Sequence, residues 1–492
     1  MKKLLIPILA IASLFFTGCV NDDIDFNDDT SKTYTASAEA LLSNSQKELT
    51  DQMTTPSVNL NVFRYFSQYW AATLYRAESR YNLTSRRIPD NHWRVLYTRV
   101  LGNLKTAKEV VDAEAKPENI DQATWDKIQI NKSAIIEILN VYTYQILVDS
   151  FGDVPYTEAL QPVNIVLPKY DDDQAIYLDL LSRLNAATAQ LDANFASFSK
   201  GDLLYNGNIA KWKLFANSLK VKLAINISDV NNSLAQSTIE SAYTAGVITA
   251  NSDNALVQFN SFSPNYNQIF GELVASNRND FVPTSVFVDE LNTLNDPRRP
   301  VFFTPMADGS YVGGAYGYTN TQPYETSYSH IGNEIKKADA KGVLFDAAEV
   351  NFYLAEAAAR GYNVGGTPDT YYSAAITASL NYWNIPTGDI STYLGQSTVA
   401  YATAAGTWKE KIGKQAWIAL YNRGFESWNS FRRLDAPGLT APPSAFPVAE
   451  GKIPVRLTYP VNEQTVNGNS YQAASAAIGG DKLTTKVFWD VN

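Results

Sequence analysis

Apolar residues recur along most of the chain at the spacing of amphipathic helices. In the segment 131–149 one such face holds Ile135, Ile138, Leu139, Tyr142 and Ile146. This i, i+3, i+4, i+7 spacing places side chains on one side of an α-helix. Similar patterns predict four more helices, at 93–113, 172–193, 208–229 and 409–431. The periodicity therefore predicts a mainly α-helical protein.

Two further helices are expected close together around residue 360. The first has an apolar face from Val350 to Ala358 and ends near Gly361, a residue suited to a left-handed helix end. The second has an apolar face made of Tyr371, Ala374, Ala375, Ala378 and Tyr382. Two helices with a short connection and Ala at the close contacts are typical of tetratricopeptide-type pairs. Because the full consensus of about 34 residues is absent, we expect degenerate repeats.

The helical periodicity stops between residues 250 and 345, where Asn, Gly, Ser, Pro and Tyr dominate. Here we expect long irregular loops carrying a few short strands, and the Pro- and Gly-rich segment 436–492 predicts loops as well. Long loops on a rigid scaffold often carry binding sites. Because no Gly/Ser or Pro linker divides the chain, we expect a single domain over residues 31–492.

The first residues have the pattern of a cleaved secretory signal. Two lysines precede an apolar run, Leu4–Phe16, that is too short to cross a bilayer. The run leads into Cys19, the only cysteine of the chain. This arrangement is similar to a bacterial lipobox, in which the thiol is lipidated and becomes the new N-terminus. We therefore expect a lipoprotein signal peptide over residues 1–18 and lipidation of Cys19. A single cysteine also excludes a disulfide framework.

The residues that follow, 19–30, are too acidic to fold by themselves and are interpreted as a solvated tether. Loss of residues 1–18 removes 2 of the 40 basic residues, which leaves 38 basic against 50 acidic side chains and a net charge of −12. This charge argues against nucleic acid or an anionic lipid surface as a partner. No later segment is apolar for the roughly 20 residues of a spanning helix. We therefore expect attachment to the membrane through the lipid anchor only.

Five stretches of the chain carry a family resemblance, and they lie at 147–159, 205–219, 349–361, 426–433 and 479–489. Together with Cys19 they resemble the SusD/RagB-like nutrient-binding lipoproteins of the Bacteroidota. The resemblance implies a SusD-like, α-helical fold with tetratricopeptide-type pairs. It also implies a location in the outer membrane, facing the cell surface, and delivery of a nutrient to a SusC-like TonB-dependent transporter.

The stretches themselves have a structural interpretation. In the first, Gly152 permits a turn, Pro155 prevents continuation of a helix, and Asp149 and Asp153 can accept hydrogen bonds from backbone donors. The charged residues of the stretch 426–433 indicate an internal salt-bridge and capping network. The ligand site is therefore expected elsewhere.

Residues suited to catalysis are few. His92 and His330 stand alone, and the chain contains no His-Glu-x-x-His, Gly-x-Ser-x-Gly or phosphate-binding glycine motif. Asp171-Asp172-Asp173 directly precede a helix, where carboxylates stabilise the helix dipole. We therefore expect no catalytic residue, no cofactor and no metal site. A surface glycoside hydrolase remains an alternative, because the separation of any two carboxylates depends on folding.

Aromatic residues in a polar, loop-like context are the candidates for ligand binding. Flat rings stack on the apolar faces of sugars while polar side chains bind their hydroxyls. The candidate residues are Asn91, Trp93, Tyr311, Tyr316, Tyr318 and Tyr324, and we expect them to meet in one exposed site. The expected ligand is an oligosaccharide or glycan. An oligopeptide is the alternative, since a groove of Tyr and Asn would also accept an extended backbone.

Overall fold

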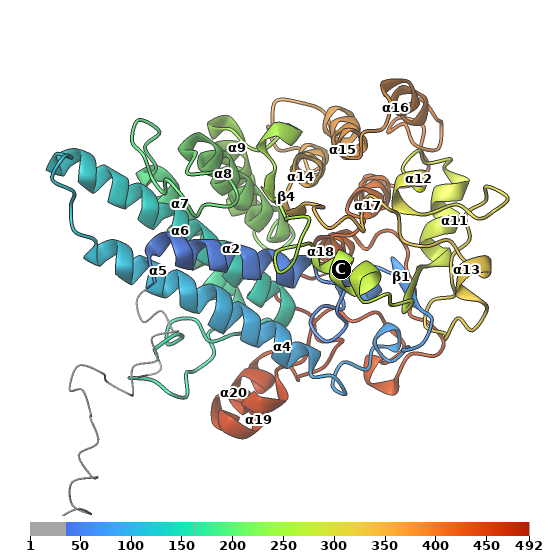
Figure 1. Ribbon diagram of the computed structural model, residues 1–492, viewed down its shortest axis with the longest axis horizontal. Coiled ribbons are helices and arrows are strands. Elements are labelled where there is room, and N and C mark those ends of the chain that lie inside the picture. The colour runs from blue at the N-terminus through green and yellow to red at the C-terminus, as the bar shows by residue number, and fades with distance from the viewer. Residues whose placement is uncertain (1–35, 162, 492) are drawn as a thin grey trace, which may run out of the picture. The chain divides into compact units, whose positions relative to one another are not determined.

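The computed structural model describes residues 36–491 except residue 162, so the signal peptide, Cys19 and the whole tether, residues 19–30, lie outside the described residues. The described part is mainly helical, as the periodicity predicts (Figure 1). Its helices are α2 (Ala38–Thr54), α3 (Phe63–Phe66), α4 (Ile88–Arg94), α5 (Gly102–Ala113), α6 (Gln122–Phe151), α7 (Asp173–Gln190), α8 (Ile209–Asn226), α9 (Asn232–Ala245), α10 (Gln268–Phe270), α11 (Ser285–Thr293), α12 (Arg299–Phe302), α13 (Tyr324–Ser327), α14 (Ala347–Ala359), α15 (Pro368–Tyr382), α16 (Thr387–Leu394), α17 (Trp408–Ala419), α18 (Gly424–Leu434), α19 (Val461–Val466) and α20 (Gly468–Ala477). Among these helices none combines the length and the apolar character needed to span a bilayer.

The tetratricopeptide-type pair expected around residue 360 is present. Helices α14 and α15 lie side by side near the top of Figure 1. Gly361 follows α14 with a left-handed φ of 87°, and Thr367 caps α15 by accepting a hydrogen bond from the backbone N–H of Thr370 at 3.1 Å. The pairs α6–α7 and α8–α9 pack in the same way. The scaffold is thus a set of neighbouring helix pairs, which confirms the expected fold class.

The few strands form two antiparallel ribbons. One pairs β1 (Trp70–Ala72) with β3 (Phe281–Pro283), and the other pairs β2 (Ala255–Val257) with β4 (Gly342–Phe345). Three of the four strands lie in the segment 250–345, where short strands between loops are expected. The β1–β3 ribbon joins two segments about 210 residues apart in sequence, and it determines where the following loops meet.

The segment 409–431, expected as one helix, is two helices, α17 and α18. At the break, Asn422 provides acceptors for a buried arginine: Arg64 donates from Nε to the side-chain Oδ1 of Asn422 at 3.0 Å and from Nη2 to its backbone carbonyl oxygen at 3.2 Å. Asn422 has a left-handed φ of 71°. Next to it, a Cβ on Gly424 would lie 2.5 Å from the backbone nitrogen of Arg64. The segment 436–492 also differs from expectation, because it contains α19 and α20 in addition to loops.

Three of the five family stretches meet around the carboxylate of Asp149, near the C-terminal end of α6. This side chain is fully buried and accepts hydrogen bonds from Trp489 Nε1 at 2.9 Å, from Asn429 Nδ2 at 3.0 Å and from the hydroxyl of Tyr177. Burial raises its pKa, and the charge of Arg432 together with these hydrogen bonds opposes that shift. The contacts join α6, α7, α18 and the C-terminal segment, in agreement with a structural role for these stretches.

Candidate ligand-binding cleft

Trp93 lies in α4 and is half-buried. Its ring packs against Tyr97 at 4.9 Å, Phe151 at 5.1 Å and Tyr170 at 5.8 Å between centroids. Phe151 is the last residue of α6, so Trp93 covers the end of a core helix. Most of its ring surface is therefore used for packing within the domain.

The candidate tyrosines differ in exposure. Tyr316 is only 7% exposed, and its hydroxyl donates a hydrogen bond to the carbonyl oxygen of Tyr65 at 2.6 Å. Tyr311 is partly buried against the core. Tyr324 stacks on His330 with centroids 4.1 Å apart. Tyr316 is thus part of the core, whereas Tyr311 and Tyr324 keep part of their surface in solvent.

Two of the candidates, Tyr318 and Asn91, are linked by hydrogen bonds to the segments around β1. Tyr318 is 44% exposed. The side chain of Asn320 holds the backbone of this segment, because its Nδ2 donates to the carbonyl oxygen of Tyr318 at 3.2 Å and to that of Ala72, the last residue of β1, at 2.8 Å. Asn91 Nδ2 donates to the carbonyl oxygen of Asn59 at 2.9 Å. In contrast, helices α4 and α13 lie well apart in Figure 1. Trp93 lies in α4, and Tyr324 is the first residue of α13.

Asn59, the acceptor of the Asn91 amide, lines a narrow cleft next to the β1–β3 ribbon. The cleft encloses only about 30 Å³, about the volume of one water molecule, so a larger ligand would lie on the surface around it. The pairing of the ribbon continues with a hydrogen bond from the Thr73 N–H to the carbonyl oxygen of Asp280 at 2.9 Å. Beyond Thr73, Leu74 is 62% exposed and Tyr75 is 55% exposed. The cleft is lined by Pro56, Ser57, Val58, Asn59, Tyr75, Arg86, Glu272, Arg278, Asp280 and Phe281. Its geometry places an exposed aromatic ring beside several polar side chains.

The charged groups of the cleft are held by one another. Arg278 donates from Nε to Asp280 at 2.7 Å and from Nη1 to Glu272 at 2.8 Å. Arg86 pairs with the buried Glu78, and its guanidinium carbon lies 5.4 Å from the centre of the Tyr75 ring. Two guanidinium groups thus face three carboxylates, so the cleft carries no excess of positive charge. Fixed donors and acceptors beside an exposed ring suit a neutral, hydroxyl-rich ligand.

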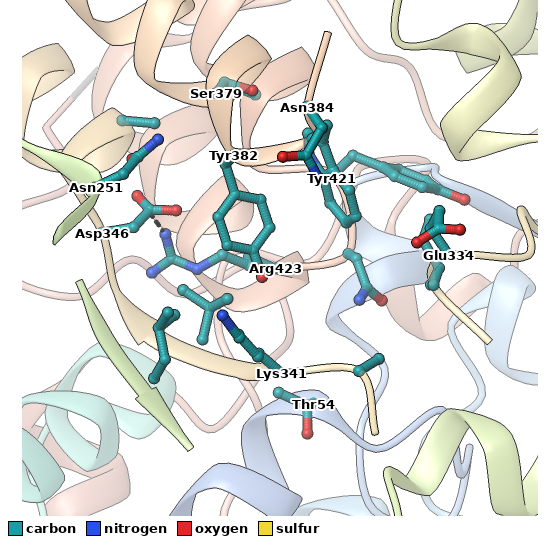
Figure 2. Close-up of a pocket in the computed structure, with 18 of the residues that line it drawn as sticks. Thr54, Asn251, Glu334, Lys341, Asp346, Ser379, Tyr382, Asn384, Tyr421 and Arg423 are labelled. Atoms are coloured by element: carbon teal, nitrogen blue, oxygen red, sulfur yellow. Dashed lines mark ion pairs between the residues drawn. The ribbon is translucent and has the colours of Figure 1, made fainter. Parts of the chain in front are cut away.

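Sequence reasoning missed Tyr75 and the residues around it. Tyr75 lies between the buried tyrosines Tyr69 and Tyr81, and no periodicity separates it from them. Only the pairing of β1 with β3 brings Arg278 and Asp280 to its side. A second, larger cavity of about 740 Å³ lies near β4 and the end of α15, and it is lined by residues that sequence reasoning did not select (Figure 2).

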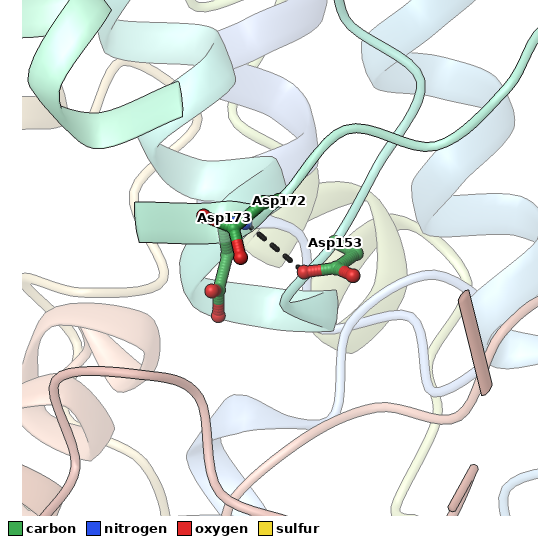
Figure 3. Close-up of side chains that lie close together, drawn as sticks. All are labelled: Asp153, Asp172 and Asp173. Carbon is green, nitrogen blue, oxygen red and sulfur yellow. Dashed lines mark hydrogen bonds between the residues drawn. The ribbon is translucent and has the colours of Figure 1, made fainter. Parts of the chain in front are cut away.

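Three carboxylates that could approach one cation lie at the start of α7. Oxygen atoms of Asp153, Asp172 and Asp173 lie within 4.8 Å of one another (Figure 3). Asp153 accepts a hydrogen bond from the backbone N–H of Asp173 at 3.0 Å, and Asp173 accepts one from that of Phe488 at 3.0 Å. Asp172 caps α7 by accepting from the N–H of Ala175 at 2.8 Å. Each carboxylate therefore already serves a backbone donor.

This cluster predicts a pH dependence of stability. Burial raises the pKa of Asp153 to about 6 and the pKa of Asp173 to about 7. In the unfolded chain aspartates titrate near pH 3.9. The folded protein therefore binds protons more tightly at these two carboxylates than the unfolded chain does. The resulting stability is fully present below about pH 4 and is lost as the pH rises through 6 to 7. We expect each group to reduce the free energy of unfolding by up to about 1.4 kcal/mol per pH unit in this window.

Urea unfolding at a series of pH values measures this dependence. Asp173→Asn keeps an acceptor for the N–H of Phe488 but cannot titrate, so its stability should fall less steeply between pH 4 and 7 than that of the wild type. Asp112→Asn, on the exposed face of α5, is the matched control and should leave the slope unchanged. If the free energy of unfolding falls equally steeply with pH in the wild type and in Asp173→Asn, Asp173 does not contribute to the pH dependence and the prediction is wrong.

The paired helices form the scaffold of the chain, and the cleft lies among loops beside the β1–β3 ribbon. The chain belongs to the SusD-like family, described as starch-binding and associating with the outer membrane, whose profile matches residues 28–460. The fold is similar to that of a chitin-binding protein, with a TM-score of 0.78 and 28% identity over 92% of this chain and 100% of the other. No curated protein shows significant sequence similarity.

Two further solved structures share the fold. A chitin-binding SusD homologue from Flavobacterium johnsoniae has a TM-score of 0.76 and 24% identity, over 92% of this chain and 98% of its own. A SusD homologue from Bacteroides uniformis has the same TM-score and identity, over 92% and 99%. The expected SusD-like fold is thereby confirmed over nearly the whole chain.

Proposed function

We propose that this protein binds a glycan on the exposed surface around Tyr75 and delivers it to a SusC-like TonB-dependent transporter of the outer membrane. The observation that carries the proposal is the exposed ring of Tyr75 between the paired groups of Arg86, Arg278 and Asp280. The ring offers a stacking face, and the fixed polar groups offer hydrogen bonds to hydroxyls. Asn91 and Tyr318 are proposed to support and extend this site.

Family membership supports the choice of ligand. The family is described as starch-binding, and two proteins of similar structure are described as chitin-binding. Both polymers are neutral glucose-type glycans, which agrees with the absence of excess positive charge in the cleft. We propose that the protein itself is not an enzyme, that it is attached to the outer membrane through lipidated Cys19, and that it faces the cell surface.

Replacing Tyr75 by Ala is expected to weaken glycan binding by about 1 to 3 kcal/mol, the loss typical of an aromatic anchor. Because the ring is 55% exposed, folding stability should change by less than about 0.5 kcal/mol. Calorimetric titration with short chito- and malto-oligosaccharides measures the affinity, and thermal unfolding measures the stability. Tyr75→Phe keeps the stacking face and should retain most of the affinity.

Leu178→Ala, a similarly exposed apolar residue on α7, serves as the control and should bind like the wild type. Unchanged affinity in Tyr75→Ala would remove this cleft from the proposal. Titration with oligopeptides in place of saccharides tests the peptide alternative. Release of reducing sugars during the titration, abolished by mutation of one carboxylate, would instead identify a hydrolase.

A further inference from the structure

One short helical segment borders both the cavity of about 740 Å³ and the Tyr75 cleft. This segment consists of α10 and the π-helical turn Gly271–Ala275 that follows it. Asn267, the residue before α10, lines the cavity, and Glu272 in the π-helical turn lines the cleft. Residues from β2, β4, the end of α15 and the break between α17 and α18 form the walls. Its volume is within the roughly 300–1,000 Å³ of known small-molecule sites.

Aromatic and amide side chains reach into this cavity. Figure 2 shows the ring of Tyr382 in its centre, with Tyr421 beside it and Lys341 extending toward it from below. Asn384 and Asn251 stand on opposite sides. Tyr382 is held by an edge-to-face contact with Trp383 at 4.9 Å. The cavity thus offers a central ring surrounded by hydrogen-bonding groups from separate elements.

One residue of the lining, Arg423, has a buried donor without a hydrogen-bond acceptor among the described residues. The side chain of Arg423 is 91% buried. Its Nη1 lies 3.0 Å from Asp346 Oδ1. Its Nη2 donates hydrogen bonds to the carbonyl oxygen of Leu344 at 3.0 Å and to Glu349. Within the described part of the chain, its Nε–H has no hydrogen-bond acceptor. A buried donor without an acceptor is costly. The nitrogen itself is buried, so a ligand oxygen reaches it only if the side chain shifts toward the cavity.

The charges of the lining restrict the class of ligand. Three acidic and three basic residues line the cavity and balance one another: Glu334, Asp339, Asp346, Lys337, Lys341 and Arg423. Two of the pairs are formed directly, between Lys337 and Glu334 and between Arg423 and Asp346. A balanced lining gives no net attraction to an anion or a cation. Amides and hydroxyls around a ring instead match a neutral molecule with several hydroxyl groups.

We propose that this cavity is a second saccharide site, distinct from the Tyr75 cleft, that takes a short neutral oligosaccharide. Tyr382 forms the stacking face, and Asn384 binds hydroxyl groups. The choice of a saccharide rests on the proposed glycan-binding function. Because the two sites use different residues, they can be tested separately.

Calorimetric titration of the full-length protein with short chito- and malto-oligosaccharides tests the second site. We expect two binding events in the wild type, of which Tyr75→Ala weakens one and Tyr382→Ala weakens the other by at least about 10-fold. Asn384→Gly removes the amide without straining the left-handed backbone, which has a φ of 57°, and should weaken the same event as Tyr382→Ala. Tyr471→Ala, a partly buried tyrosine on α20, is the control for ring removal and should leave both events intact.

The outcomes separate this inference from the proposed function. A single binding event that is lost in Tyr75→Ala and unchanged in Tyr382→Ala and Asn384→Gly overturns the second site and leaves the first. A single event lost only in Tyr382→Ala and Asn384→Gly supports the cavity and overturns the assignment of the cleft. Absence of any saccharide binding to correctly folded wild type, as judged by thermal unfolding, overturns both.

Discussion

Replacement of Asp149 by Ala is expected to lower the free energy of unfolding by about 3 to 5 kcal/mol. The carboxylate is fully buried and accepts hydrogen bonds from Trp489, Asn429 and Tyr177. Without it, these donors remain in the core with one acceptor fewer, and each unsatisfied donor costs about 1 to 3 kcal/mol. The buried cation of Arg432 also loses a neighbouring negative charge.

Chemical denaturation followed by tryptophan fluorescence measures this loss. Asp149→Asn retains one acceptor oxygen and nearly the same shape, so it should be less destabilising than Asp149→Ala. Asp112→Ala, which removes an exposed carboxylate paired with Lys108, should cost less than about 1 kcal/mol. Equal losses in Asp149→Ala and Asp112→Ala would show that the three family stretches do not depend on this carboxylate.

Replacement of Cys19 by Ala is expected to move nearly all of the protein from the membrane fraction to the soluble fraction. The variant cannot be acylated, and the acyl chains supply the apolar area that holds such a protein on a bilayer. Cys19 precedes the described residues, so this expectation rests on the lipobox pattern of the sequence.

Fractionation of cells followed by immunoblotting measures the partition. Asn21→Ala lies two residues beyond the acylated position and keeps the thiol, so it should stay with the membranes. If Cys19→Ala also stays there after a carbonate wash, lipid anchoring through this residue is wrong.

Helices could be predicted where their buried faces have a simple period. The apolar face of 131–149 and the pair around Gly361 follow such a period, and both are present. The break between α17 and α18 could not be predicted, because both helices are largely buried and their apolar pattern continues across it. At the break, Asn422 accepts hydrogen bonds from Arg64, more than 350 residues away in sequence.

The candidate site could be predicted only in part for a similar reason. A polar sequence context marks Tyr316 and Tyr318 equally, yet the first is 7% and the second 44% exposed. The difference arises because Tyr65 supplies a buried acceptor for the hydroxyl of Tyr316. Conversely, Tyr75 follows an apolar run and resembles a core residue, but the β1–β3 ribbon ends before it and leaves it in solvent.

The contact between Arg64 and the α17–α18 break also has a consequence for folding. Ser67 accepts through its carbonyl oxygen from the indole of Trp417 at 2.8 Å and donates through its hydroxyl to the carbonyl oxygen of Gly424 at 3.0 Å. The segment after α2 therefore has its buried partners close to the opposite end of the polypeptide. Such distant pairing makes chain closure slow. The early segment cannot complete its packing before residues 417–424 have been synthesised, so this part of the core forms late in folding.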